Sequence, residues 1–271
     1  MYNQLMKTLD LKNPFAAPVY HEETVSSTFD IARNLAANNE KHGTVITADF
    51  QEAGRGRLNR NWVAERGKNL MFTILLRYGN ISSIPEALTI KTGLAVSLAL
   101  EDAAPALAGK VLVKWPNDVM ILSCDARCAA NAQAAFKVAG ILTESDGSNV
   151  YIGVGVNVAQ SEFPEEYRSK AGSLIQVCPE LNEQLRFSLL ERILFRLYAE
   201  TGLGSNESWR ERIGKRLYKK CEIVSFAEGR ADSGRVIEGT LSGIGSGGEL
   251  LIIPNGELEE QSFITGELRV Y

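Results

Sequence analysis

The first part of the chain alternates between apolar runs that favour strands and apolar positions spaced for helices. Residues 42–50 and 69–78 are rich in β-branched and large apolar side chains, which predicts a strand on each side of a basic loop. Residues 29–39 keep helical spacing behind a run of hydroxyl residues that predicts a cap. Residues 85–104 predict a long, largely buried helix with Pro85 in its first turn.

The middle of the chain adds strands and a further helix. Residues 111–118, VLVKWPND, predict a short strand that ends in a polar turn. Two strand-like runs at 136–145 and 149–158 are separated by the turn signal DGSN, so we expect a hairpin. Leucine and isoleucine recur every fourth position within 182–200, which indicates an amphipathic helix, and a short helix is expected around Trp209.

After about residue 214 the pattern changes to short apolar runs divided by glycine-rich turns, which is typical of a small antiparallel barrel. We therefore predict two domains, residues 1–213 and residues 214–271. The fold class is α+β: a mixed β-sheet packed with helices, followed by a small β-barrel.

Composition places the chain among ordinary globular proteins. It has 271 residues, 45% of them hydrophobic, and a formal net charge of -4, which disfavours a nucleic-acid binder. The four cysteines lack the paired spacing of a zinc site, and we interpret them as reduced thiols. Neither a signal peptide nor a run of about eighteen apolar residues is recognisable, so we expect a cytoplasmic protein without a membrane span.

The basic loop at residues 51–62, QEAGRGRLNRNW, is the first candidate for chemistry. It combines three arginines, Arg55, Arg57 and Arg60, with Gly54 and Gly56. Glycine lets backbone N–H groups approach an anion, and guanidinium groups bind phosphate or carboxylate bidentately. No Gly-Lys-Ser/Thr follows, so the loop is not of the Walker type. A solvated basic turn is the alternative for such a run alone.

KWPND, residues 114–118, offers Lys114, Asn117 and Asp118 as polar ligands at the end of a strand. Asn and Asp beside proline are also ordinary turn formers, so a simple turn is the alternative. If the motif is functional, Asn117 and Asp118 would lie near a magnesium ion, because hard oxygen ligands suit a hard cation.

Two further segments complete the candidate set. KVAGIL places Lys137 at the start of an apolar strand, where a lysine ordinarily extends to water. GVGVN places Gly153 and Gly155 inside a strand, where glycine costs stability and marks a bulge or the close approach of a ligand. We favour the close approach of a ligand.

These four motifs, in this order, resemble those of the biotin protein ligases: GRGRxGRxW, KWPND, KxxGIL and GxGxN. The resemblance covers residues 20 to 160 through motifs and the C-terminal part more weakly. It implies a class II synthetase-like biotin/lipoate ligase fold with an SH3-like barrel. It also implies an enzyme that uses ATP and Mg²⁺ to make biotinyl-adenylate and transfers biotin to a lysine of a biotin carboxyl carrier protein, without a bound prosthetic group.

The resemblance also implies site residues. Biotin would be held by Ser27, Thr28, Gln51, Arg55, Gly56, Arg57, Lys137, Gly153 and Gly155. ATP would contact Trp62, Lys114, Asn117 and Asn157, magnesium would bind Asn117 and Asp118, and the catalytic residues would be Lys137, Arg55 and Arg57.

The chain departs from the family pattern at three places. Asn59 stands where the loop motif has glycine, and asparagine tolerates a left-handed backbone. Phe29 stands where asparagine often follows Ser-Thr. The link from Asp118 to Lys137 is longer than usual and carries Cys124 and Cys128, so we expect an exposed loop or a short helical excursion there.

Other functions stay open at this stage. A lipoate ligase would share the fold and the adenylate chemistry, although the loop and KWPND motifs favour biotin. A non-catalytic biotin-binding or nucleotide-binding regulator is disfavoured by the retained lysine and arginines. No helix-turn-helix precedes the predicted catalytic domain, so we expect no repressor function. A homodimer is compatible with the sequence.

Overall fold

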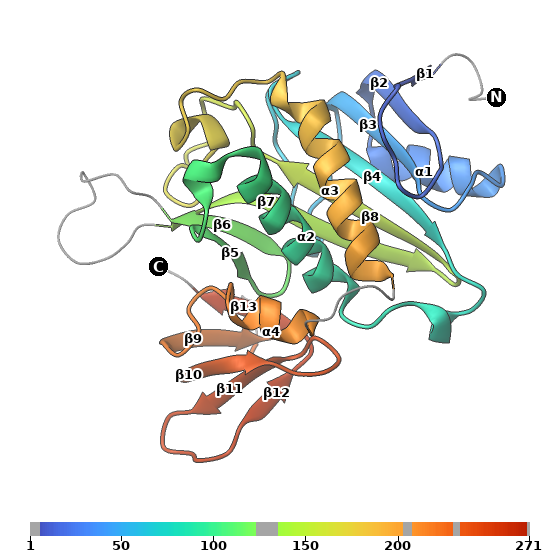
Figure 1. Ribbon diagram of the computed structural model, residues 1–271. Helices are drawn as coiled ribbons and strands as arrows, with labels where there is room; N and C mark the ends of the chain where they lie inside the picture. Colours follow the sequence, from blue (N-terminus) through green and yellow to red (C-terminus); the bar gives the residue numbers. More distant parts are fainter. Residues whose placement is uncertain (1–5, 123–134, 203–207, 230–233, 270–271) are drawn as a thin grey trace.

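The computed structural model describes residues 6–122, 135–202, 208–229 and 234–269. Within them the chain forms two β-sheets and four α-helices (Figure 1). No helix in these ranges is long and apolar enough to cross a membrane. The predicted loop or helical excursion with Cys124 and Cys128 falls mostly on residues 123–134, which lie outside the described residues.

The larger sheet has eight strands in the order β1-β2-β3-β4-β8-β7-β6-β5. Only β2 and β3 pair in parallel; the other neighbours are antiparallel. The strands are β1 Lys7–Thr8, β2 Val19–Val25, β3 Thr44–Gln51, β4 Leu70–Arg77, β5 Val111–Lys114, β6 Asp118–Leu122, β7 Ala135–Asp146 and β8 Asn149–Val156. The predicted mixed sheet is confirmed, and so is the hairpin, which is β7 and β8.

The four helices also follow the predicted pattern, with one correction at a start. They are α1 Thr28–Ala37, α2 Leu88–Ala103, α3 Leu185–Thr201 and α4 Trp209–Gly214. Ser27 caps α1, because its hydroxyl accepts from the Phe29 backbone N–H. We expected Pro85 in the first turn of α2, but this helix begins three residues later, because the backbone of Ala87 is left-handed (φ 56°) and interrupts the helical path.

Short 3₁₀ turns lie in several connections, at η1 Arg57–Asn59, η2 Ile81–Ser83, η3 Pro105–Leu107 and η4 Leu174–Gln176. The sequence analysis predicted neither β1, β2 nor β6, and β2 is the longest of these. Its segment, VYHEETV, carries polar residues at its centre and lacks the continuous apolar run of its parallel partner β3. A strand of this kind is recognisable only from its place beside β3.

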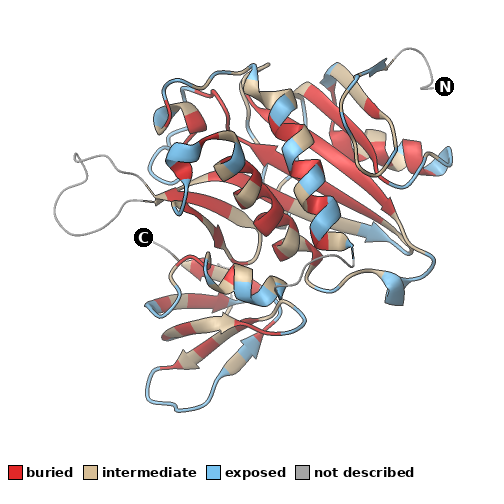
Figure 2. Ribbon diagram, in the orientation of Figure 1, coloured by how far each residue is buried: buried red, intermediate tan, exposed pale blue. Residues whose placement is uncertain are grey.

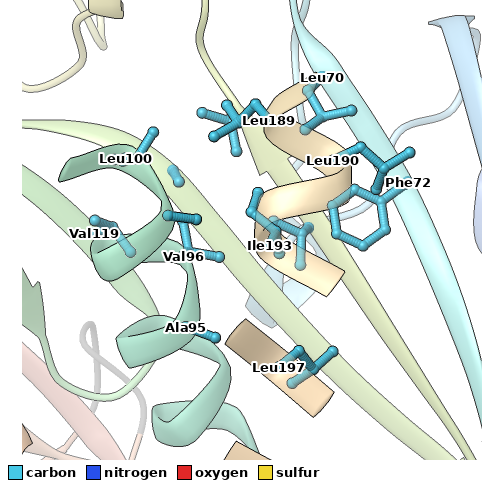
Figure 3. Close-up of a cluster of buried hydrophobic side chains, with 14 of the residues drawn as sticks. Leu70, Phe72, Ala95, Val96, Leu100, Val119, Leu189, Leu190, Ile193 and Leu197 are labelled. Atoms are coloured by element: carbon cyan, nitrogen blue, oxygen red, sulfur yellow. The ribbon is translucent and has the colours of Figure 1, made fainter. Parts of the chain in front are cut away.

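The two faces of the large sheet are covered unequally. Side chains alternate along a strand, so Ile152 and Val154 of β8 face the core under α2 and α3, while Tyr151 faces α1. Helices α2 and α3 lie side by side across one face, and the strands beneath them are largely buried (Figures 1 and 2). Figure 3 shows Leu190 and Ile193 of α3 packed over β4 in this core. On the other face, the ten-residue α1 is the only helix of the described residues; it packs on β3, β4 and β8 and leaves part of β7 and β8 uncovered by helix.

The second sheet has five antiparallel strands in the order β12-β11-β10-β9-β13. They are β9 Ile223–Glu228, β10 Val236–Ile244, β11 Leu250–Pro254, β12 Gln261–Phe263 and β13 Gly266–Arg269. The apolar side chains of this sheet form one buried cluster with Ile90 and Leu94 of α2 and with Trp115. The predicted small C-terminal β domain is therefore present and shares its core with the rest of the protein.

Gly248 lies where the second sheet meets the start of α2 and Trp115. Its carbonyl accepts a hydrogen bond of 2.9 Å from the Trp115 indole. Its φ is +91°, and an added Cβ would lie 2.8 Å from the Cβ of Ala87. Glycine at this position therefore lets the turn of the second sheet pack closely against Ala87.

We predict that Gly248→Ala destabilises the protein more than Gly256→Ala. Gly256 has a similar φ of +84° but open space around it, so its substitution costs only the left-handed strain of about 1 kcal/mol. At Gly248 overpacking against Ala87 adds about 1–3 kcal/mol. Urea unfolding of both variants measures the difference, and equal losses of unfolding free energy would contradict this account of the junction.

Candidate functional site

The floor of the candidate site is a part of the large sheet that carries almost no side chains. Gly140 of β7 pairs with Gly155 of β8, and Leu142 pairs with Gly153. Val154, between the two glycines of β8, belongs to the core on the opposite face. The predicted close approach at these glycines is therefore to the face that α1 covers only in part.

Two aromatic rings lie over this floor. A Cβ added to Gly153 would come within 2.2 Å of Phe29 Cε2, and one added to Gly155 within 2.4 Å of Trp62 Cε2. The space above the glycines is thus taken by Phe29 and Trp62 in this structure. Trp62 Nε1 is buried and lacks a hydrogen-bond partner among the described residues, so an acceptor atom on a ligand would satisfy it.

The basic loop brings Trp62 to the floor by folding back on itself. Gly56 N–H donates to the Arg60 carbonyl at 2.7 Å, and Trp62 N–H donates to the Gly54 carbonyl at 3.0 Å. A Cβ on Gly54 would lie 2.6 Å from the Trp62 carbonyl oxygen, so glycine is needed there for this close return. The glycines of the loop therefore serve its own turn as well as the site.

Leu58 and Asn59 form the tip of this loop, and both have a left-handed backbone, with φ of 55° and 59°. The expectation that Asn59 can replace glycine by adopting this conformation is confirmed. Leu58 adopts it as well, although a leucine at positive φ is unfavourable, and its side chain is 47% exposed.

Three cationic side chains from two separate segments meet at one pocket of about 60 Å³. Arg55 and Arg57 come from the loop, Lys137 comes from β7, and all three line the pocket together with Gly56. These are the three residues that the resemblance to the biotin protein ligases implies as catalytic, and they share one cavity.

Arg57 lies deepest among the loop cations. Its Nη1 donates to Asn117 Oδ1 at 3.1 Å, while Asn117 Nδ2 donates to the Ile141 carbonyl at 2.9 Å. Burial lowers the pKa of the Arg57 guanidinium, and the charges of Asp118 and Glu267 partly oppose that shift. A half-buried cation of this kind gains most from a further anion.

Lys137 and Arg55 are each held by one carboxylate. Lys137 Nζ lies 2.6 Å from Asp118 Oδ1 and 5.7 Å from the centre of the Trp62 ring. Arg55 forms an ion pair with Asp30 in the first turn of α1, where both side chains are more than a third exposed. Both carboxylates thus orient cations that face the pocket.

A group of hydroxyl and amide side chains lines the pocket away from Lys137. The Thr28 backbone N–H and Oγ1 donate to Gln51 Oε1 at 2.8 and 3.0 Å, and Thr73 Oγ1 donates to Thr28 Oγ1 at 2.8 Å. Among the described residues, Gln51 Nε2 meets only the weakly accepting sulfur of Met71, at 3.4 Å, so its N–H groups are available to a ligand. Ser27, by contrast, is fully buried as the α1 cap and does not line the pocket.

Two residues predicted to contact ATP lie beside the pocket and do not line it. The Asn157 side chain is buried and donates to the Gly172 carbonyl at 3.1 Å. Lys114 lies near Asp118 and Glu267, and burial lowers the pKa of its ammonium against the opposing charge of these two carboxylates. A contact of either residue with ATP therefore stays a prediction.

Arg60 joins the loop to the C-terminal sheet. Its guanidinium donates two hydrogen bonds to Glu267 of β13, at 3.0 and 2.9 Å. Burial by itself would raise the pKa of Glu267, but the hydrogen bond and charge of Arg60, with a contribution from Lys114, bring it below its usual value. A residue 207 positions away therefore fixes one side of the basic loop.

A second cavity of about 390 Å³ adjoins the first and shares Arg57 and Asn117 with it. Its other walls are the start of α2 at Leu88 and the glycine turn of the C-terminal sheet at Gly248. The candidate site thus continues from the glycine floor into the junction between the two sheets.

The predicted magnesium ligands are already engaged by cations. Asn117 Oδ1 accepts from Arg57, and Asp118 pairs with Lys137. Within the described ranges, no group of three or more His, Cys, Asp or Glu side chains is placed to hold a metal ion. In this arrangement the side chains do not fit a magnesium site built by the protein alone.

Sequence reasoning missed two residues that line the pocket, Phe29 and Gly140, and two that hold its neighbours in place, Thr73 and Glu267. Gly140 lies inside the quoted KVAGIL motif and was available as a signal. Phe29 was noted only as a departure from the family pattern. Thr73 and Glu267 carry no local signal, because each reaches the site through pairing with a distant strand or side chain.

Comparison with known proteins agrees with this geometry. Residues 22–157 match the biotin/lipoate A/B protein ligase family. The bifunctional ligase/repressor BirA of Bacillus subtilis is 36% identical over 169 residues, 60% of this chain and 47% of that protein. The chain thus spans about half the length of the first curated relatives it matches. The biotin--[acetyl-CoA-carboxylase] ligase of Mycobacterium tuberculosis is 29% identical and is matched over 87% of this chain and 86% of its own length.

The fold agrees with solved structures as well. The biotin protein ligase of Aquifex aeolicus, in complex with biotin and ATP, superposes with a TM-score of 0.70 and 27% identity over 93% of this chain and 97% of that one. The match of residues 22–157 covers half of the chain and includes the loop, KWPND, KVAGIL and the glycines of β8. The protein belongs to the biotin/lipoate A/B protein ligase family.

Proposed function

We propose that this protein is a biotin protein ligase, which activates biotin with ATP to biotinyl-5'-AMP and transfers the biotinyl group to a lysine of a carrier domain. The observation that carries the proposal is the pocket in which Arg55, Arg57 and Lys137 meet over a glycine floor. At the other end of this pocket, Thr28 and Gln51 offer the hydroxyl and amide groups that a ureido ring requires.

In the first step, a carboxylate oxygen of biotin attacks the α-phosphorus of ATP. A bond forms between the carboxylate oxygen and the α-phosphorus. The bond from the α-phosphorus to the oxygen that bridges to the β-phosphate breaks, and pyrophosphate leaves. Two anions must meet for this reaction, so the protein contributes chiefly by positioning them and by stabilising negative charge with fixed cations. Lys137 and Arg57 are the cations that lie best for this role, because each is already oriented by a side chain of the KWPND turn.

In the second step, the neutral ε-amine of the acceptor lysine attacks the acyl carbon of the adenylate. A C–N bond forms, the C–O bond to the phosphate breaks, AMP leaves, and the amine gives up one proton to solvent. The protein holds the reactive intermediate away from water until the acceptor arrives. The basic loop covers the pocket and is tied to Glu267 through Arg60, so it is the element suited to this task.

The carrier, the cofactor and the compartment belong to this proposal. Two of the relatives are biotin--[acetyl-CoA-carboxylase] ligases, which favours a biotin carboxyl carrier protein as the acceptor. Magnesium would enter with ATP as part of the substrate, because Asn117 and Asp118 are engaged by Arg57 and Lys137. Consumption of ATP and four cysteines without paired spacing fit a cytoplasmic enzyme, and the net charge of -4 gives no reason to propose a nucleic-acid partner.

The direct test is to incubate the protein with MgATP, labelled biotin and a purified carrier domain. We expect ATP-dependent label on the carrier lysine and release of pyrophosphate. Lipoate in place of biotin is the control, because a lipoate ligase of the same family would label its own carrier instead. Binding of biotin without pyrophosphate release would support a non-catalytic regulator and would contradict the proposal.

We predict that Lys137→Ala slows single-turnover formation of the adenylate about a hundredfold, since one fixed cation at the reacting phosphate is removed. Lys41→Ala, a change at an exposed lysine outside the pocket, serves as the matched control. Quenched-flow measurement of pyrophosphate gives both rates, and thermal unfolding confirms that each variant is folded. A wild-type rate in Lys137→Ala would remove this residue from the mechanism.

We predict that Arg57→Ala releases the adenylate about ten to a hundred times faster, because a charge-assisted hydrogen bond contributes roughly 1.5–3 kcal/mol. The control is Arg66→Ala, since Arg66 lies near the same loop but packs over the Phe50 ring outside the pocket. Dissociation of labelled adenylate, followed by filter binding, measures both. Equal dissociation rates for the two variants would show that Arg57 does not retain the intermediate.

A further inference from the structure

Phe29 occupies an unusual place in the pocket. It lies in the first turn of α1, is only 3% exposed, and packs with Leu35 and Tyr151 in the buried cluster under this helix. The edge of its ring nevertheless lines the pocket and covers Gly153. One side chain is therefore both part of the core and a wall of the candidate binding site.

The wall made by Phe29 differs from the one made by Trp62. Trp62 is carried by the basic loop and belongs to none of the buried hydrophobic clusters of the described chain. Phe29 is anchored in such a cluster, and its backbone N–H donates to the Ser27 cap. Closely packed interiors resist displacement, so the position of Phe29 is fixed much more firmly than that of Trp62.

The positions of Lys137 and Phe29 along the pocket follow from the glycines of β7 and β8 beneath them. A Cβ on Gly140 would lie 3.0 Å from Lys137 Nζ, so the charged end of the pocket is at the Gly140–Gly155 pair. Gly153 is two residues further along β8, which is about 7 Å at the usual rise of a strand. Phe29 therefore limits the pocket at the end away from Lys137.

We propose that Phe29 is a specificity-determining residue that limits the length of an acyl substrate whose carboxylate is held at Lys137. The inference rests on the proposed function. With the carboxylate held at Lys137, the distal ring of the acid lies toward Phe29, and the fixed phenyl ring limits how far it extends. The pocket accepts an acid with the length of biotin and rejects one that is longer by a single methylene.

The discriminating experiment compares biotin with homobiotin, whose side chain is one methylene longer, and norbiotin, whose side chain is one methylene shorter. The wild-type protein uses homobiotin poorly, because one misplaced methylene in a fixed apolar pocket costs about 10 to 200-fold in kcat/KM. Phe29→Ala raises the ratio of kcat/KM for homobiotin over biotin at least tenfold and does not raise the ratio for norbiotin. Pyrophosphate release gives all three constants.

Leu35→Ala is the matched control for a merely structural effect. Leu35 lies in the same buried cluster on the same helix but does not line the pocket. Both variants lose stability, whereas only the Phe29 variant changes the substrate ratio. If Phe29→Ala fails to fold, Phe29→Leu provides the same comparison with a smaller loss of volume.

A second variant tests the contact between the wall and the floor. Gly153→Ala in the wild-type background places a methyl group 2.2 Å from Phe29 Cε2 and lowers stability. In the Phe29→Ala background the same change is tolerated. The double variant therefore loses less unfolding free energy than the sum of the losses of the two single variants. Additive losses would contradict the packing on which the inference depends.

The outcomes separate this inference from the proposed function. If the wild-type protein releases no pyrophosphate with biotin, the proposed function fails. If the protein uses biotin but Phe29→Ala leaves the ratio of kcat/KM for homobiotin over biotin unchanged, only the role of Phe29 is overturned. The same holds if the wild-type protein already uses homobiotin as efficiently as biotin.

Discussion

The unequal covering of the large sheet is the constraint on which the rest of the molecule depends. One face is buried under α2 and α3, and this packing supplies most of the apolar core. On the other face α1 is the only helix of the described chain, and beyond it β7 and β8 place Gly140 opposite Gly155 under the basic loop. A sheet that is packed on one side and carries glycines on the other lets a ligand approach its backbone without loss of the sheet's own hydrogen bonds.

Above that floor, the structure concentrates positive charge that it only partly neutralises. Asp118 pairs with Lys137, Asp30 pairs with Arg55, and Arg57 donates to the neutral Asn117. A partly buried guanidinium without its own carboxylate gains from an anionic ligand more than an exposed one does, since water screens it less. The net charge of the chain gives no hint of this local excess, which arises because two distant segments meet.

The C-terminal sheet contributes to the site. Its core is shared with α2 and Trp115, and its Glu267 holds Arg60 of the basic loop. The cavity beside the pocket has Gly248 in its wall, so the two sheets enclose it together. The loop that covers the glycine floor is thus supported from both parts of the protein.

Sequence alone determined much of this protein. Periodicity predicted the four helices and most strands, because apolar spacing reflects which face of an element is buried. Four short motifs identified the cations and glycines, because the charge of arginine and lysine and the missing side chain of glycine are properties of the single residue. The boundary at residue 214 between the two predicted domains remains an expectation from the change in texture.

Only the tertiary structure decided which residues meet. In the structure Ser27 is the N-terminal cap of α1, and the ring of Phe29 lies against Gly153. Lys114 and Asn157 do not line the pocket. Glu267 and Thr73 entered the site through contacts across the chain that leave no local pattern. Local sequence specifies which segments form strands and helices and which of their faces are apolar. Which elements lie next to each other follows from how these faces pack together, and that depends on the whole chain.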